Sequence, residues 1–124
     1  MATTQDLIET YMSVWQIMDS DKRLRLIETI WSAESSYQDP TAQVFGPAGL
    51  NAVVDGFHKA FPGHRLVLRG GIDEHHGKLR FHWSMLDGQD QLVITGVDFA
   101  EVDDRGKLQT IVGFFNKPGE ESPF

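Results

Sequence analysis

The sequence predicts an α+β fold in which three N-terminal helices pack on one face of a strongly curved, mostly antiparallel sheet. In the first half of the chain, apolar residues recur at three- and four-residue steps, which is the period of an amphipathic helix. In the second half the pattern alternates instead, and short glycine-containing turns separate the alternating segments. Helices followed by a run of strands are typical of α+β proteins. A bent sheet closed by three helices should leave a cone-shaped pocket.

The first two helices are expected before residue 32. Thr3 and Asp6 have the spacing of a capping box at the start of the first helix. Six apolar residues recur at helical steps in it: Leu7, Ile8, Tyr11, Val14, Trp15 and Met18. The second helix begins at Ser20 or Asp21 and buries four apolar residues: Leu24, Ile27, Ile30 and Trp31. Its basic stretch Lys22-Arg23-Leu24-Arg25 is interpreted as a solvent-exposed face.

A polar stretch over 32–36 is expected to end the second helix. Tyr37-Gln38-Asp39-Pro40 is then a short strand or a loop, because a residue that precedes proline is disfavoured in helical geometry. The third helix follows Phe45-Gly46-Pro47 and stops at Pro62-Gly63. Five apolar residues form one face of it: Leu50, Val53, Val54, Phe57 and Phe61.

Four strands are predicted after the helices, over 65–72, 78–86, 91–102 and 108–115. Turns at His76-Gly77, Asp87-Gly88 and 103–106 join them as successive antiparallel hairpins. In the third of these strands one face carries Ile94, Gly96 and Asp98, and the other carries Val93, Val97 and Phe99. Because both faces of the last two strands are apolar, one face should cover the pocket and the other should be buried in a homodimer.

The composition excludes several classes of function. The 124 residues fit one domain over 1–124, with an ordered core over about 5–116 and a loose tail over 117–124. A net charge of -7 argues against nucleic acid or a membrane surface as a partner. The chain has no cysteine, which excludes disulfides and thiolate sites. No signal peptide or membrane-spanning run is visible, so a cytoplasmic protein is expected.

No metal site and no cofactor are expected. The five histidines include no pair at the i, i+4 helical spacing of a zinc site, and His75-His76 is interpreted as the end of a hairpin. Gly70-Gly71 lacks the following helix that a dinucleotide site requires.

Asp98 is the most informative residue because it lies in the apolar run 92–99, where a strand should be buried. An isolated buried charge costs several kcal/mol unless it is paired, hydrogen-bonded or neutralised. A neutral carboxylic acid in a dry pocket can instead donate a hydrogen bond to a substrate oxygen. The alternative is a structural acid bonded to a tyrosine or tryptophan in the core. For Asp39, beside Pro40, the alternative is a turn or capping residue.

The order of helix, helix, Tyr-x-Asp-Pro, helix and four-strand meander resembles the nuclear transport factor 2-like superfamily, which has a cystatin-like fold. Within it, the chain is most similar to SnoaL-like polyketide cyclases and ketosteroid isomerases, over about residues 5–116 as one SnoaL-like domain. Five segments carry the resemblance: Tyr37-Gln38-Asp39-Pro40, Gly46-Pro47-Ala48-Gly49-Leu50, Phe61-Pro62-Gly63-His64, Arg80-Phe81-His82-Trp83 and Gly113-Phe114-Phe115. The superfamily contains both enzymes and non-catalytic binding domains.

The resemblance implies three catalytic positions. The proton-shuttling base of the isomerases falls on Asp39, and their neutral acid that stabilises the enolate oxygen falls on Asp98. In SnoaL-like cyclases the acid/base aspartate also comes from the strand of Asp98. Tyr11 is the candidate for the tyrosine that assists at the enolate oxygen, with Val14 or Trp15 as alternatives because the first helix is about one turn longer here.

The expected activity is that of a small-molecule isomerase or cyclase without a cofactor. It would abstract a proton next to a carbonyl of a hydrophobic substrate. Seven residues are expected to bind that substrate: Trp15, Phe57, Phe81, Trp83, Met85, Ile94 and Phe115. Trp15 and Trp83 are large, which suggests a small or flat ligand. The alternative is a non-catalytic module on the same fold that binds a hydrophobic ligand or dimerises.

Overall fold

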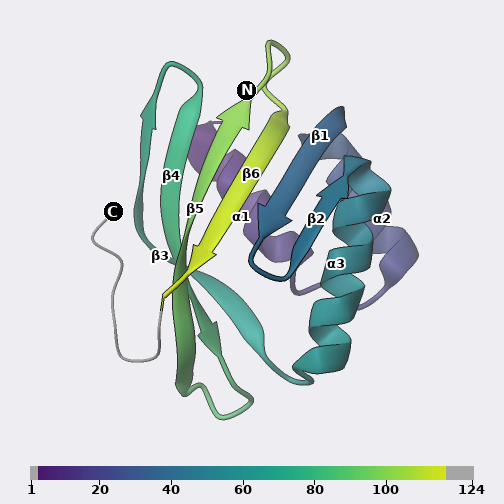
Figure 1. Ribbon diagram of the computed structural model, residues 1–124, viewed down its shortest axis with the longest axis vertical. Coiled ribbons are helices and arrows are strands. Elements are labelled where there is room, and N and C mark those ends of the chain that lie inside the picture. The colour runs from purple at the N-terminus through teal and green to yellow at the C-terminus, as the bar shows by residue number, and fades with distance from the viewer. Residues whose placement is uncertain (1–2, 117–124) are drawn as a thin grey trace.

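The computed structural model describes residues 3–116, so the tail expected over 117–124 lies outside the described residues. The fold is α+β, as the sequence predicts, with a curved and unclosed sheet of six strands (Figure 1). The elements follow one another along the chain as α1 (Thr4–Val14), α2 (Ser20–Ile30), β1 (Trp31–Asp39), β2 (Ala42–Phe45), α3 (Gly46–Ala60), β3 (Arg65–His75), β4 (Lys78–Leu86), β5 (Leu92–Val102) and β6 (Leu108–Phe115).

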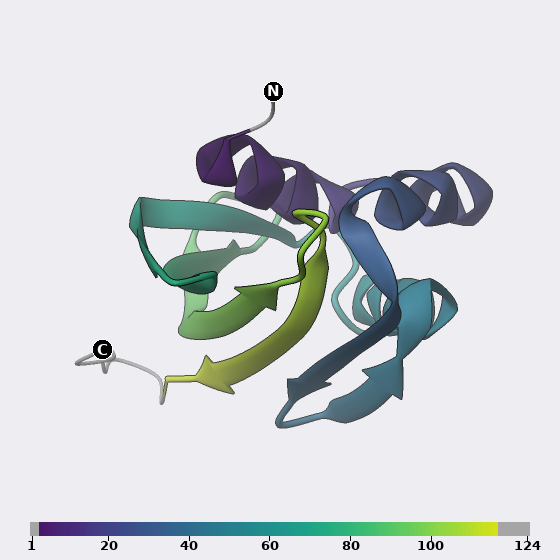
Figure 2. The same ribbon diagram turned by 90° about the horizontal axis from the view of Figure 1, so that it is seen from above.

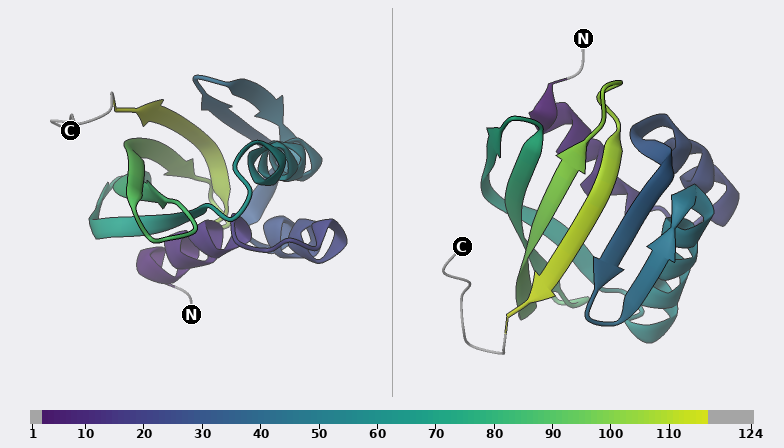
Figure 3. Two further views of the ribbon diagram at one scale, coloured as in Figure 1. Left: turned by 90° about the horizontal axis from the view of Figure 1, so that it is seen from below. Right: turned by 45° about the horizontal axis from the view of Figure 1, so that its top comes forward.

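The sheet has the strand order β2-β1-β6-β5-β4-β3. Neighbouring strands pair antiparallel except for β1 and β6, which run parallel. Seen from above, the sheet curls around the side on which α1 lies (Figure 2). Views from below and from the top edge show the same curvature and the β1–β2 hairpin beside α3 (Figure 3). The hydrophobic core lies between the curled sheet and the helices (Figure 2).

The helix starts agree with the sequence, but the first helix is shorter than expected. Thr3 and Asp6 form the predicted capping box, with each side chain bonded to the other residue's backbone N–H. The helix ends at Val14, and Trp15 caps it. Met18 was expected to share the buried face, yet it is 70% exposed, because it lies in the loop before α2.

The second helix ends where a strand begins without any loop. Trp31, expected in the helix, is the first residue of β1, and the polar segment 32–36 continues that strand. The helix does end before these polar residues, but the sequence did not predict that they form a strand. Within this segment Ser36 pairs with Phe45 on β2 and with Thr110 on β6, and the β1–β6 register is irregular between Trp31 and Ser36. Pairing with strands that lie far away in the sequence leaves no local pattern.

The interpretation of Arg23 as a solvent-exposed residue was also wrong. Its side chain is 0% exposed and forms an ion pair with Asp55 on α3. Its other donors bond Asn51 Oδ1 at 2.8 Å and the backbone oxygen of Ile17 at 3.2 Å. These partners provide hydrogen bonds and a negative charge for the buried guanidinium. They also link α2 to α3 and to the loop that precedes α2. Across residues 3–116, no helix is both long and apolar enough to cross a membrane.

Candidate active site

A cavity of about 610 Å³ lies between the curled sheet and helices α1 and α3. A volume of this size is ordinary for a small-molecule site. All of the major elements except α2 contribute to its wall, which consists of Tyr11, Met12, Trp15, Tyr37, Asp39, Thr41, Ala42, Val53, Gly56, Phe57, Ala60, Phe61, Leu66, Trp83, Met85, Val93, Ile94, Asp98 and Phe115.

The wall is apolar apart from a small group of residues with oxygen-bearing side chains: Tyr11, Tyr37, Asp39, Thr41 and Asp98. These oxygens are carboxyl and hydroxyl groups, and no lysine, arginine or histidine belongs to the described wall. Among the described residues, a ligand in the cavity therefore meets acids and hydroxyls but no positive side chain. Such a wall favours a ligand without negative charge.

Asp98 is buried in the strand, as the sequence predicts, at 6% exposure. Its Oδ1 accepts a hydrogen bond of 3.0 Å from the indole N–H of Trp83. Burial raises the pKa of Asp98 to about 7, the Trp83 bond opposes this rise, and the nearby charge of Asp39 adds to it. Asp98 can therefore gain and lose a proton near neutral pH.

Asp39 lies beside Asp98 because a single glycine separates them in the sheet. Gly113 on β6 is the register partner of Asp98 on β5, and β1 runs along the other side of β6. A Cβ atom at position 113 would lie 2.7 Å from Asp98 Oδ1 and 3.6 Å from Asp39 Cβ. The lack of a side chain at Gly113 thus lets the two carboxyl groups face the same space.

Three donors hold the carboxylate of Asp39. Its Oδ2 accepts from the Tyr37 hydroxyl at 2.6 Å, and its Oδ1 accepts from the backbone N–H and the hydroxyl of Thr41, both at 2.7 Å. The bond to the Thr41 backbone is the turn geometry that the alternative for Asp39 describes. The same residue also belongs to the cavity wall, so the turn fixes the carboxylate where a ligand can reach it.

Both tyrosines of the wall remain protonated at any physiological pH. Burial is the main cause that raises the pKa of Tyr11 well above its ordinary value, and the nearby charges of Asp98 and Asp39 add to it. The Trp15 side chain bonds Tyr11 and opposes the rise. Burial also raises the pKa of Tyr37, followed by the influence of Tyr11 and the two aspartates. Each hydroxyl can therefore act as a hydrogen-bond donor.

The structure brings nearly all of the sequence-predicted site residues to this one cavity. The three catalytic candidates are on its wall, and so are six of the seven expected substrate-binding residues: Trp15, Phe57, Trp83, Met85, Ile94 and Phe115. The expectation for Phe81 needs correction. Its side chain is 0% exposed and packs edge-on against Tyr11 at 6.1 Å between ring centroids, so it supports the wall from behind.

Ten of the nineteen wall residues were not among the sequence-predicted site residues, and Val93 and Tyr37 are the most informative of them. Val93 was placed on the opposite face from Ile94, but a bulge in the β4–β5 pairing inserts it between the pairs Met85–Ile94 and Leu86–Leu92. It therefore lines the cavity next to Ile94. Tyr37 was seen only as part of the Tyr-x-Asp-Pro motif. Its spacing of two residues from Asp39, which puts both on one strand face, was the signal for its role.

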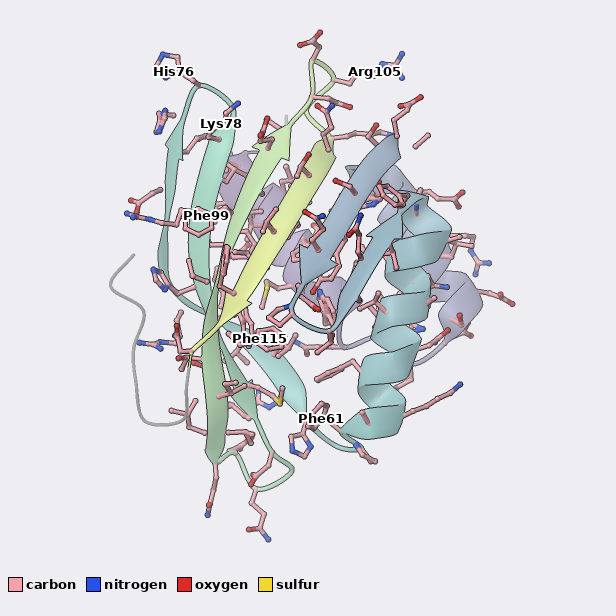
Figure 4. The ribbon with its side chains drawn as sticks, viewed as in Figure 1. Phe61, His76, Lys78, Phe99, Arg105 and Phe115 are labelled. Atoms are coloured by element: carbon pink, nitrogen blue, oxygen red, sulfur yellow. The ribbon has the colours of Figure 1, made fainter. Side chains whose placement is uncertain are left out.

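Three partly exposed residues mark where the cavity meets solvent: Phe61, Val93 and Phe115, at 40%, 41% and 38% exposure. Figure 4 shows Phe61 at the end of α3 and Phe115 at the end of β6. An apolar rim of this kind suits the entry of a hydrophobic ligand. Among the described residues, no group of three or more His, Asp or Glu side chains could hold a metal ion.

The structure is similar to three solved structures of related fold. A candidate isomerase of the SnoaL-like family from Agrobacterium tumefaciens has 29% sequence identity and a TM-score of 0.87, covering 91% of this chain and 97% of that chain. A candidate SnoaL-like polyketide cyclase from Jannaschia sp. CCS1 has 12% identity and a TM-score of 0.68, covering 94% and 90%. A cystatin-like protein of unknown function from Methylobium petroleophilum has 18% identity and a TM-score of 0.72, covering 94% and 78%.

At these identities the second and third similarities show the fold alone, whereas the first extends to a moderate sequence likeness. No protein-family model and no curated protein sequence matches the chain.

Proposed function

From the premise that this chain has the nuclear transport factor 2-like fold of the SnoaL-like proteins, we propose that it is an isomerase or cyclase that works without a cofactor. Its reaction is the abstraction of a proton next to a carbonyl group of a hydrophobic substrate. The observation that carries the proposal is the pair of carboxyl groups of Asp39 and Asp98, which face the same space at the polar part of an otherwise apolar cavity.

Asp39 is the base in this proposal. Its carboxylate takes the proton from the carbon next to the carbonyl, and the electron pair of the broken C–H bond moves to the carbonyl oxygen, which becomes an enolate. Bonds to Tyr37 and Thr41 hold the carboxylate in place while it reacts. A base in a fixed position next to the reacting carbon is worth several orders of magnitude in rate.

Asp98 in its neutral form donates a hydrogen bond to the enolate oxygen, and the Tyr11 hydroxyl can donate a second. An ionised Asp98 would repel the enolate, so the raised pKa of about 7 is what lets the residue serve this role near neutral pH. With an unsaturated ketone the conjugated enolate takes the proton back from Asp39 at a carbon farther along the conjugated system, which is isomerisation. With a second carbonyl in the same molecule, the enolate carbon attacks that carbonyl, and the alkoxide oxygen that forms takes the proton from Asp39, which is ring closure.

The cavity wall limits the substrate to a molecule that is small, hydrophobic and not negatively charged. Trp15, Phe57 and Trp83 provide flat apolar surfaces, and the wall as residues 3–116 form it contains no lysine, arginine or histidine to balance a carboxylate or phosphate. Neutral cyclic ketones meet these requirements, because they combine an apolar body with one hydrogen-bond acceptor.

The proposal can be tested with the bicyclic ketone 2-tetralone in D₂O. Exchange of the protons next to its carbonyl, followed by NMR at about pH 6, reports proton abstraction directly. We expect the protein to accelerate the exchange and Asp39→Asn to reduce the acceleration about 10²–10⁴-fold, because an amide cannot take up the proton. Asp98→Asn keeps a donor and should retain part of the rate, whereas Asp98→Ala should lose about 10²-fold or more.

Asp21→Asn is the matched control, since Asp21 is exposed on α2 away from the cavity. Tryptophan fluorescence gives an independent measure of binding, because Trp15 and Trp83 belong to the wall. Quenching by 2-tetralone without accelerated exchange would favour the alternative function, a non-catalytic module that binds hydrophobic ligands. Equal exchange by the parent and Asp39→Asn would remove Asp39 as the base.

A further inference from the structure

The indole of Trp83 occupies space that is free only because residue 96 is a glycine. Trp83 on β4 and Gly96 on β5 are register partners. A Cβ atom at position 96 would lie 2.1, 2.4 and 2.7 Å from the Trp83 ring carbons Cζ2, Cε2 and Cη2. The ring thus rests directly on the backbone of Gly96. Any residue with a side chain there would displace the ring, so space rather than backbone conformation requires this glycine.

A second contact fixes the ring from another side. Phe115 on β6, the register partner of Gly96, meets Trp83 nearly at right angles, with 5.6 Å between ring centroids. With the ring held in this way, its N–H points at Asp98 Oδ1, which lies two residues farther along β5 from Gly96. The acceptor oxygen itself lies in the space that a side chain at Gly113 would fill.

The donor character of the indole decides where the proton of Asp98 can be. An indole N–H can donate but cannot accept, so Oδ1 must be the acceptor in this bond. A carbonyl oxygen is a better acceptor than a hydroxyl oxygen, so this bond favours the neutral acid that carries its proton on Oδ2. Oδ2 makes no hydrogen bond with any other described side chain, and Asp98 belongs to the cavity wall. The proton is consequently presented to the ligand.

We propose that Trp83 is a positioning residue for Asp98, which directs the acidic proton onto Oδ2 and toward the ligand, and that Gly96 is required because it makes room for the indole. The catalytic consequence of this inference rests on the proposed function, but the placement of the proton does not. A test that uses the protein without substrate therefore separates the two proposals.

The titratable groups that face Asp98 limit the alternatives. Asp39 and Tyr37 approach it from β1 and Tyr11 from α1, while the neighbouring strands β4 and β6 present Trp83 and Gly113. Asp39 raises the pKa of Asp98, and Trp83 is the group that lowers it. Removing the indole N–H should therefore raise the pKa of Asp98, whereas removing the charge of Asp39 should lower it.

The test is a carboxyl-resolved NMR titration of the parent, Trp83→Phe and the control Trp15→Phe, which removes an indole of the same cavity that does not bond Asp98. The lost bond stabilises the ionised form, so Trp83→Phe should raise the midpoint of Asp98 by about one pH unit. Trp15→Phe should leave it near the parent value. A Trp83→Phe midpoint equal to that of the parent would overturn the inference.

Gly96→Ala should raise the same midpoint, because its methyl group displaces the indole. Gly71→Ala is its control, since a Cβ atom there has open space and its backbone conformation suits any residue. The parent protein alone offers a second test, which does not depend on whether a variant folds. One of its three tryptophan indole N–H resonances should shift with pH at the midpoint of Asp98. If none of the three moves at that midpoint, the inference fails.

The rate of proton exchange of 2-tetralone is a further test of the proposed proton position. A higher Asp98 midpoint leaves more neutral acid at about pH 7, which by itself would speed the exchange. Loss of the fixed proton position should instead slow it about tenfold in Trp83→Phe, a factor within the usual effect of misplacing a catalytic group. A faster exchange in this variant would contradict the positioning role.

Discussion

At the scale of single residues, Asp98 combines the two interpretations that its position in an apolar strand allowed. It is a buried acid bonded to a tryptophan, and it is also part of a ligand cavity. Its strand and its burial could be predicted because an acid interrupts an apolar run. A bond to a tyrosine or tryptophan was one alternative, but the choice of Trp83 and the closeness of Asp39 could not be predicted. Both depend on the space that the missing side chains of Gly96 and Gly113 leave free.

The raised pKa of Asp98 has a consequence for stability. The folded protein holds this proton up to about pH 7, whereas the unfolded chain releases it at the ordinary value of 3.8. The folded state thus binds more protons between these values, and stability falls as the pH rises through this window. At about 1.4 kcal/mol for each unit of pKa, the loss above pH 7 is on the order of 4 kcal/mol.

Asp98→Asn removes the ionisable group and keeps the shape, so it should escape this loss. We expect the variant to be more stable than the parent at about pH 8.5, and the difference to shrink toward about pH 4.5. Urea unfolding of both proteins at the two pH values measures it, and the exposed change Asp21→Asn serves as the control. A stability difference that does not depend on pH would mean that Asp98 ionises with an ordinary pKa in the folded protein.

At the scale of elements, helices with strong periodicity and strands bounded by turns were predictable, whereas of β1 only the end, from Tyr37, was expected as a strand or a loop. Its residues 32–36 are polar and follow a helix directly, so they looked like a helix terminator. The strand depends on its parallel pairing with β6, whose residues are more than seventy positions away. This pairing places Asp39 across β6 from the strand of Asp98, with only Gly113 between the two side chains. The feature most important to the site therefore had no local signal.

Arg23 shows the same limit for a helix face. In sequence it belongs to a basic stretch, and only the packing of α2 on α3 reveals Asp55 and Asn51 as its buried partners.

The length of β5 was predicted nearly to the residue, yet its bulge was not. Bulges shift one residue to the other face without changing the alternating pattern enough to be seen.

At the scale of the whole molecule, the outer face of the sheet leaves aromatic residues in solvent. Phe99 and Phe114 contact each other edge-on at 6.0 Å between ring centroids, with exposures of 36% and 54%. Figure 4 shows Phe99 on the viewer's side of the sheet, while α1 lies behind it. An exposed aromatic pair on a sheet face is typical of an interaction surface, and we propose that a second copy of the chain covers it.

Light scattering at micromolar concentration tests this assembly. We expect a particle of twice the 14.0 kDa chain mass, and Phe114→Glu should shift it to the single chain because a charge would be buried in the interface. Phe45→Glu, which changes an exposed phenylalanine on β2, is the control and should leave the dimer intact. A parent protein that scatters only as a 14.0 kDa species would contradict the proposal.

The central claim is that Asp98, at the polar part of an apolar cavity and beside a second carboxylate, is a carboxylic acid that holds its proton up to about pH 7. A carboxyl-resolved NMR titration of the unmodified protein tests it most directly, because it needs neither the natural substrate nor a variant. The claim predicts a midpoint for Asp98 at about 7. A midpoint near the ordinary value of 3.8 would contradict it, since Asp98 would then be ionised at neutral pH and would repel an enolate.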